Sequence, residues 1–215
     1  MDYELTFDSP DWADWYPERF GAFATTGFTA FNLVTMLATR STICHVGEVW
    51  QLRSRTNNLV TTKVYAEMQL GANGLVGPRF WKRLEDWQRN GWPLRKVRSV
   101  WLPFNSFVAH ELWHKAADIQ RRKVGYAANQ NLAIWGKRRF GWKYIPNDPT
   151  HQNCSEHLTL MLHPRIDLTD SEHPTADHVD PGTAWRNLKS TLVPSVSLPT
   201  PSQSRHHHKR NLATA

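Results

Sequence analysis

The sequence predicts an α+β domain in which a small antiparallel sheet packs against helices. Two segments, Ile43–Leu52 and Leu59–Leu70, are rich in residues typical of strands, and they flank the turn residues Asn57-Asn58. This arrangement predicts a β-hairpin. Apolar residues recur at helical spacing over Asn105–Lys123, and another helix is expected over Cys154–Leu162. Strands and helices of ordinary length in one chain favour this fold class.

The length and composition indicate one globular domain. The chain has 215 residues, which suffices for a hydrophobic core of its own. Hydrophobic residues make up 40% and charged residues 21%, proportions that exclude disordered and fibrous classes. We expect one domain with an acidic N-terminal lead over residues 1–192. A disordered basic tail, rich in Pro and Ser, is expected over residues 193–215.

The first half of the chain holds one stretch that could be mistaken for a membrane span. Phe20–Thr39 carries no charge, but five threonines, an asparagine and two glycines dilute its hydrophobicity. We therefore expect no transmembrane segment, and a buried stretch with a helix over Phe28–Ala38 instead. Glycines predict a loop over Gly71–Pro78. A short helix is expected over Phe80–Arg89 and a third strand over Leu94–Leu102.

The second half of the chain contains the clearest helix, Asn105–Lys123. Ser106 is its expected cap and Gly125 its expected end. A further helix over Asn129–Arg138 and a turn at Pro146–Pro149 should lead to the helix that opens at Cys154. The apolar stripe of the clearest helix consists of Phe107, Val108, Leu112, Ala116 and Ile119.

Cysteine content and charge bear on the chain's surroundings. Cys44 and Cys154 are the only cysteines, too few for a disulfide framework and compatible with a reducing cytoplasm. The acidic start of the chain predicts that no secretory signal peptide is present. The formal net charge of +7 makes an anionic polymer surface a plausible partner.

Three residues suggest nucleophilic catalysis. Cys154 stands at the start of an expected helix, where the positive end of the helix dipole favours a thiolate. A thiolate nucleophile needs an imidazole to exchange its proton, and His45 lies in a predicted strand that could present one. Glu67 lies on the second strand of the hairpin, where a carboxylate could orient that imidazole. Taken singly, each is equally an ordinary packing or surface residue.

The order of these residues resembles the circularly permuted NlpC-type papain-like proteins, especially their YiiX-like branch. Thr39-Arg40-Ser41 and Cys44–Val49 resemble the early Thr-x-Ser and Ser-His-Val-Gly-Ile-Val elements of that family. Glu67 matches a Glu-Ala pair on its second strand, and Gly125-Tyr126 resembles a later Gly-x-x-Tyr-Asp turn. Asn153–Leu158 is similar to the Tyr-Cys-Ser-Glu-Leu-Val nucleophile motif. It also resembles the Asn-Cys-Glu-His element of lecithin:retinol acyltransferase-like proteins.

The resemblance implies a permuted papain-like fold and a cysteine hydrolase that needs no cofactor. Its substrates would contain a peptide, amide or acyl-ester bond, including cell-wall peptides or lipid acyl groups. The chain departs from the family where Ala127 replaces the Asp of the turn and Asn153 replaces an aromatic residue. The implied site residues are Cys154, His45 and Glu67 for catalysis, with Asn153, Ser155 and Tyr126 beside the oxyanion or substrate.

A second hypothesis is a zinc metallopeptidase. His110 and Glu111 begin an HExxH motif that His114 completes, on the clearest helix of the chain. Two histidines four residues apart share a helix face and can hold zinc while the glutamate activates water. The site needs a third ligand, for which His151, Glu156 and His157 are candidates. The first hypothesis expects no metal and leaves the two motif histidines as surface or boundary residues.

A third hypothesis is a non-enzymatic basic binding protein. The tail contains the run Arg205–Arg210, which could contact nucleic acid or an acidic envelope. Such runs are usually solvated tails, and this one has no interleaved aromatic residues that would stack on bases. The cysteine hydrolase is favoured because several ordered motifs support it and one motif supports each alternative.

Overall fold

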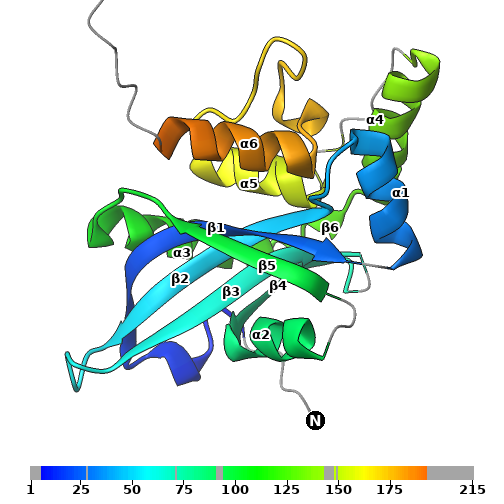
Figure 1. Ribbon diagram of the computed structural model, residues 1–215. Coiled ribbons are helices and arrows are strands. Elements are labelled where there is room, and N and C mark those ends of the chain that lie inside the picture. The colour runs from blue at the N-terminus through cyan, green and yellow to red at the C-terminus, as the bar shows by residue number, and fades with distance from the viewer. Residues whose placement is uncertain are drawn as a thin grey trace, which may run out of the picture.

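The computed structural model describes residues 6–27, 29–70, 72–90, 94–142, 148 and 150–192. Helices and strands are mixed in an α+β architecture, as the sequence predicts (Figure 1). Its main sheet has five antiparallel strands in the order β4-β3-β2-β1-β5. These strands are β1 (Trp15–Gly27), β2 (His45–Ser54), β3 (Thr61–Gln69), β4 (Gly74–Phe80) and β5 (Leu94–Trp101).

Helices cover both faces of this sheet (Figure 1). Side chains from α3, α5 and α6 pack on one face, and α2 packs on the other. Helix α1 contacts α4 beside the sheet. The helices are α1 (Ala30–Thr39), α2 (Lys82–Arg89), α3 (Ser106–Arg121), α4 (Ala128–Phe140), α5 (Cys154–Leu162) and α6 (Pro181–Leu192). Two 3₁₀ turns, η1 (Pro10–Trp12) and η2 (Ala176–His178), and a two-stranded parallel pair, β6 (Gly125–Tyr126) and β7 (His151–Gln152), complete the fold.

Side-chain alternation divides the buried residues of the sheet into two clusters. In β2, Val46 and Trp50 belong to the large core that α3, α5 and α6 cover, whereas Val49 belongs to a smaller cluster with Leu84 of α2. Successive residues of a strand point to opposite faces, so even-numbered residues of β2 face the large core and odd-numbered residues face α2. We call these the core face and the α2 face.

Strand β1, next to the middle of the sheet, was not expected from the sequence. A buried stretch was expected in Phe20–Thr39, but β1 occupies thirteen residues up to Gly27 and pairs with both β2 and β5. Residues 20–25 of β1 are all buried, so the strand lacks the polar–apolar alternation that marks a half-exposed strand. The helix expected over Phe28–Ala38 is present as α1.

The loop expected over Gly71–Pro78 was also wrong, because β4 begins at Gly74. Gly77 has a φ of +126°, and a Cβ there would lie 2.7 Å from the carbonyl oxygen of Tyr65. Only glycine allows the two strands to approach in this way, at a register shift between Tyr65 and Glu67. Gly77, which suggested a loop, is therefore part of strand β4.

Most other elements lie where the sequence predicts them. The hairpin forms from β2 and β3, and helices or strands cover the segments expected for α2, β5, α4 and α5. The expected turn at Pro146–Pro149, apart from residue 148, and the expected tail over residues 193–215 lie outside the described residues. No helix within the described ranges is both long enough and apolar enough to cross a bilayer.

Two details of α3 differ from the prediction. Its cap is Asn105 rather than Ser106, since the Asn105 side-chain oxygen accepts a hydrogen bond from the Val108 amide at 3.0 Å. Leu112 and Ile119 are buried as expected, but Phe107 is 75% exposed. Phe107 lies in the first turn of the helix. Helical periodicity alone does not show whether that turn packs on the sheet.

Candidate active site

His45 is the first residue of β2 and lies on the α2 face of the sheet. Its ring centroid is 6.3 Å from that of Phe23 on β1. Gly47, the next residue on the same face, makes room for this arrangement, because a Cβ there would lie 2.6 Å from the Phe23 ring. The strand therefore presents the imidazole at its end, with 18% of the side chain exposed.

Glu67 of β3 contacts this imidazole. The pairing of Glu48 with Ala66, continued by one residue, places Glu67 beside Gly47 and diagonal to His45 on the α2 face. His45 Nε2 and Glu67 Oε2 are 2.8 Å apart. The ring N–H is not well directed at that oxygen, so the contact is an ion pair rather than an aligned hydrogen bond. The structure thus brings together two predicted site residues that are 22 positions apart.

Cys154 is the first residue of α5, where the sequence predicts it. Asn153 caps the helix by accepting hydrogen bonds from the amides of Ser155 at 3.0 Å and Glu156 at 2.9 Å. Glu156 returns a contact by accepting from the Asn153 amide at 3.3 Å, which completes a capping box. This local sequence fixes the start of the helix and places the thiol at the positive end of its dipole.

The thiol, the imidazole and the carboxylate interact electrostatically. Burial by itself lowers the pKa of His45, but the interactions of its ring with Cys154, followed by those with Glu67, outweigh that effect. The pKa of His45 is therefore raised well above its usual range. Cys154 is itself buried, with 2% of its surface exposed. A thiol and a carboxylate thus flank one partly buried imidazole, which is the arrangement that a thiolate–imidazolium pair requires.

No known protein-family model matches the chain, and no curated protein is significantly similar to it in sequence. The family resemblance of the motifs therefore stays a prediction.

The short parallel pair β6–β7 leads the chain to Cys154. Tyr126 pairs with Gln152, two residues before Cys154, and the Ala127 amide donates to the Gln152 carbonyl at 3.1 Å. The Tyr126 amide donates to the Asn73 side chain at 3.2 Å, which ties this segment to the turn before β4. The backbone of the predicted site residue Tyr126 thus pairs with the segment that leads directly into Cys154.

Asn153 and Ser155, predicted beside the oxyanion or substrate, are fully buried. The Asn153 side-chain amide donates to Gln130 of α4 at 2.9 Å. The Ser155 hydroxyl lies 2.6 Å from the Val179 carbonyl and 2.8 Å from the Asn153 side-chain oxygen. Both side chains therefore join the start of α5 to neighbouring segments.

The second cysteine, Cys44, precedes His45 directly. It is buried, and its Sγ donates to the Thr25 carbonyl oxygen at 3.3 Å. Burial raises the pKa of the Cys44 thiol, partly opposed by the charge of His45 and the hydrogen bond with Thr25. A thiol in this state is a poor nucleophile at neutral pH.

The histidines of the HExxH motif lie on the exposed side of α3. Their rings are 4.4 Å apart, and Glu111 forms an ion pair with Arg165 at 2.5 Å. Burial and the neighbouring His114 lower the pKa of His110. Within the part of the chain that the structure describes, no three His, Cys, Asp or Glu side chains converge as metal ligands would. The proposed third ligands have other contacts: His151 pairs with Asp148, His157 pairs with Glu48, and Glu156 caps α5.

Two buried carboxylates lie near the site: Glu156, considered above only as a zinc ligand, and Glu48, which the sequence did not single out. Burial raises the pKa of Glu156 to about 7, although hydrogen bonds with Asn153 and Gln130 oppose that change. Glu48 of β2 lies 2.8 Å from His157 of α5, and both side chains are almost fully buried. The capping-box spacing could have pointed to Glu156. Alternation along β2 could have placed Glu48 on the core face, but not opposite His157.

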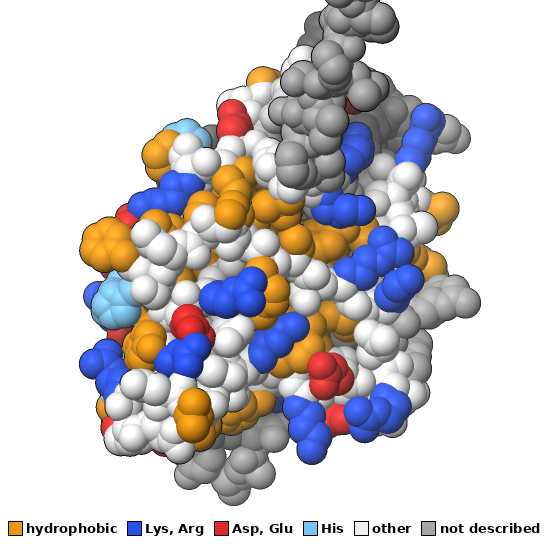
Figure 2. Space-filling view, turned by 60° about the vertical axis from the view of Figure 1, so that its left-hand side comes forward, with side chains coloured by type: hydrophobic (Ala, Val, Ile, Leu, Met, Phe, Trp, Pro, Cys, Tyr) orange, Lys and Arg blue, Asp and Glu red, His pale blue; other side chains and the backbone are white. Residues whose placement is uncertain are grey.

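A basic and aromatic surface lies on the α2 face around Gln51 of β2, six residues along the strand from His45. The Lys63 ammonium lies 3.4 Å from the ring centroid of Trp81 and donates to the Ser99 hydroxyl at 3.1 Å. The Arg19 guanidinium lies 4.9 Å from the ring of Trp101. Neither cation has an ion-pair partner among the described residues. Figure 2 shows Lys and Arg side chains scattered among hydrophobic ones, with few acidic side chains between them.

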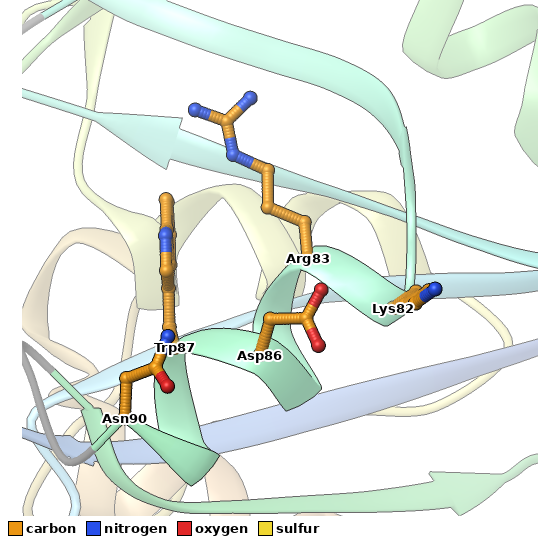
Figure 3. A pocket seen from close by; sticks show the side chains of 5 residues that line it. All are labelled: Lys82, Arg83, Asp86, Trp87 and Asn90. Carbon is orange, nitrogen blue, oxygen red and sulfur yellow. The ribbon is translucent and has the colours of Figure 1, made fainter.

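A shallow pocket lies on α2 and adds to this basic surface. Arg83 and Trp87 extend side by side from the helix, with the guanidinium 5.0 Å from the indole centroid (Figure 3). Lys82, Asp86 and Asn90 complete the lining. An anionic group would meet cations and an indole face here, with one carboxylate opposing it.

Proposed function

We propose that the protein is a cysteine hydrolase of the permuted papain-like kind, with Cys154 as nucleophile, His45 as base and Glu67 as the residue that orients the imidazole. The observation that supports it most is the single imidazole flanked by the thiol and the carboxylate, which raise its pKa despite burial. These side chains come from α5, β2 and β3, and their sequence motifs were recognised without the structure.

The geometry suggests how the reaction would run. His45 takes the proton of Cys154, and the thiolate attacks the carbonyl carbon of an amide or ester. The imidazolium then returns the proton to the leaving group, and a water activated by His45 resolves the acyl-enzyme. Glu67 keeps the ring in place and stabilises its positive charge. An acceptor other than water would make the same enzyme an acyltransferase.

The backbone amide of Cys154 is the candidate oxyanion donor. The amides of Ser155 and Glu156 are both occupied by the Asn153 side chain. Within the described residues no acceptor is found for the Cys154 amide, which belongs to the group of first-turn N–H groups that a helix leaves unpaired. It is therefore free to donate to an oxygen that develops negative charge on a carbonyl bound to Sγ.

A small thiol reagent tests this proposal before any substrate is known, because it can reach a site that is largely buried. We expect iodoacetamide to modify Cys154 at pH 6, and His45→Ala to lose that reaction. Mass spectrometry of the peptide that contains Cys154 measures the modified fraction. The modified fraction of Cys154 in Glu67→Gln should lie between those of the wild type and His45→Ala. Equal modification of the wild type and His45→Ala across pH 5–9 would contradict the dyad.

The metallopeptidase alternative needs a separate control. Turnover of an activated ester, once measured, should survive chelators and be lost in Cys154→Ser, with a fall of at least about 10²-fold in His45→Ala. Stoichiometric zinc in the purified protein, lost together with activity in His110→Ala, would overturn the cysteine assignment and favour the HExxH hypothesis.

We also propose that the basic and aromatic surface binds an anionic polymer. Lys63 supports this, because burial lowers the pKa of its ammonium and Glu85 only partly opposes that change. An anion bound there would restore the lost charge stabilisation. Heparin serves as the probe. Arg19→Gln combined with Lys63→Met should weaken binding several-fold at low salt, and more than the replacement of Lys189, an exposed cation on α6. Equal binding by both variants would contradict the assignment.

A further inference from the structure

The pair formed by Glu48 and His157 is buried beneath the candidate site, on the core face of the sheet. Its closest atoms, His157 Nε2 and Glu48 Oε1, are 2.8 Å apart, and the side chains are 1% and 0% exposed. The other ring nitrogen, Nδ1, lies 3.1 Å from the side-chain oxygen of Gln152. Strand β2, helix α5 and the segment that leads into α5 therefore meet at one imidazole.

The two partners stand at the same sequence distance from the proposed dyad. Glu48 follows His45 by three residues on β2, so alternation puts its side chain on the opposite face of the sheet. His157 follows Cys154 by three residues, which is nearly one turn of α5. The pair thus joins the strand that presents the base to the helical turn that presents the nucleophile, without contacting either group's reacting atoms.

The pair is poorly explained as a source of stability. Neither oxygen of Glu48 accepts a well-aligned hydrogen bond, and His157 Nε2 donates none, within the described part of the chain. A buried ion pair with incomplete hydrogen bonding is often no more stabilising than apolar residues of similar size. The pair does supply a directional contact between β2 and α5, which apolar packing does not.

The surroundings contribute a third charged group. Lys115 of α3 interacts electrostatically with Glu48, and its ammonium donates to the Leu160 carbonyl at 2.7 Å. Leu160 is near the end of α5, so the lysine contacts the same helix at its other end. Acid, imidazole and ammonium therefore connect β2, α5 and α3 around the helix that carries the nucleophile.

We propose that Glu48 and His157 are positioning residues, whose contact sets the distance and direction of Cys154 relative to His45. This inference rests on the proposed cysteine chemistry and extends it to a second acid–imidazole pair on the other face of β2. Because both side chains are almost fully buried, the effect of the pair on the site would pass through α5 and β2.

The test compares thiol reactivity with stability in two variants. Glu48→Met combined with His157→Leu replaces the pair by apolar groups, and Glu48→Gln keeps the shape but removes the charge. We expect the double variant to unfold at a denaturant concentration at or above that of the wild type. Its modification of Cys154 by iodoacetamide at pH 6 should nevertheless fall about tenfold or more. At pH 9 the two proteins should differ much less, because a free thiol ionises there without the imidazole.

The matched control is the ion pair between Glu18 and Arg53, which lies at the other end of β2. Glu18→Gln combined with Arg53→Gln removes an acid–base pair from the same strand, and its pH profile of modification should equal that of the wild type. A folded double variant of Glu48 and His157 with the wild-type profile would overturn the positioning role alone. If wild-type Cys154 lacked reactivity at pH 6, the proposed function and this inference would both fail. Glu48→Gln supplies the answer if the double variant does not fold.

Discussion

Glu156→Gln tests whether a buried carboxylate two residues after the nucleophile makes the fold sensitive to pH. Glu156 is 5% exposed, and burial raises its pKa from 4.5 to about 7. Glutamine cannot ionise but keeps an oxygen that can accept from the Asn153 amide. The substitution therefore removes the ionisation and leaves the capping box available.

The magnitude follows from proton linkage. The folded state holds the Glu156 proton more tightly than the unfolded state does, so this group favours folding most below pH 4.5. That stability falls as the pH rises from 4.5 to about 7, and little further change occurs above it. Each pKa unit corresponds to about 1.4 kcal/mol, which gives a loss of about 3 kcal/mol between these limits. For a domain of this size, about 3 kcal/mol corresponds to about 6–12 °C in Tm.

The assay is urea unfolding of the wild type and Glu156→Gln at pH values from 4.5 to 8. The wild type should lose about 3 kcal/mol more than the variant over this range, and the variant should be the more stable protein at pH 8. Glu172→Gln, on an exposed residue, is the control and should follow the wild type. Parallel stability curves for the wild type and Glu156→Gln would refute the reasoning, because they would show that the pKa of the Glu156 carboxyl is the same in the folded and unfolded states.

Three further predictions concern packing and the second cysteine. Gly47→Ala should destabilise the protein by about 1–3 kcal/mol in urea unfolding, since its Cβ would meet the Phe23 ring at 2.6 Å; an unchanged midpoint would contradict this close packing. Leu112→Ala, at a fully buried position, should cost about 2–5 kcal/mol, whereas Phe107→Ala, at a position 75% exposed, should change stability by about 0.5 kcal/mol or less; similar losses in both would refute the burial pattern of α3. Cys44→Ser should leave the modification of Cys154 at pH 6 intact, because burial raises the pKa of the Cys44 thiol; loss of labelling in this variant would reverse the assignment of the nucleophile.

Local signals account for what the sequence predicted well. The start of α5 was predicted at Cys154, and the structure shows that Asn153 and Glu156 form a capping box there. The hairpin followed from two strand-like segments around Asn57-Asn58. These features depend on residues within a few positions of each other, so periodicity and turn chemistry suffice to find them.

Features that depend on distant backbone were missed. Strand β1 is buried on both faces between β2 and β5, so its sequence does not alternate. Gly77 suggested a loop, because the local sequence does not show the reason for a glycine there. That reason is the close approach of Tyr65 on another strand. The contact between Glu48 and His157 depends on where α5 packs on the sheet, which neither segment encodes by itself.

The contact of His45 with Glu67 lies between these cases. Both residues were selected from motifs, and the hairpin placed them on adjacent strands. Their meeting on one face required the register in which Glu48 faces Ala66, and that register is set by the whole sheet. The candidate site was thus predicted as a set of residues, and the structure adds the geometry.

Strand β2 serves both faces of the sheet within four residues, with His45 toward Glu67 and Glu48 toward His157. Insertion or deletion of one residue between them would turn one of the two side chains to the wrong face. Insertions or deletions within residues 45–48, in evolution or in engineered variants, should therefore break one of these two contacts. The hairpin turn around Leu59, which is 92% exposed, is where added sequence such as a tag or a loop would be accommodated.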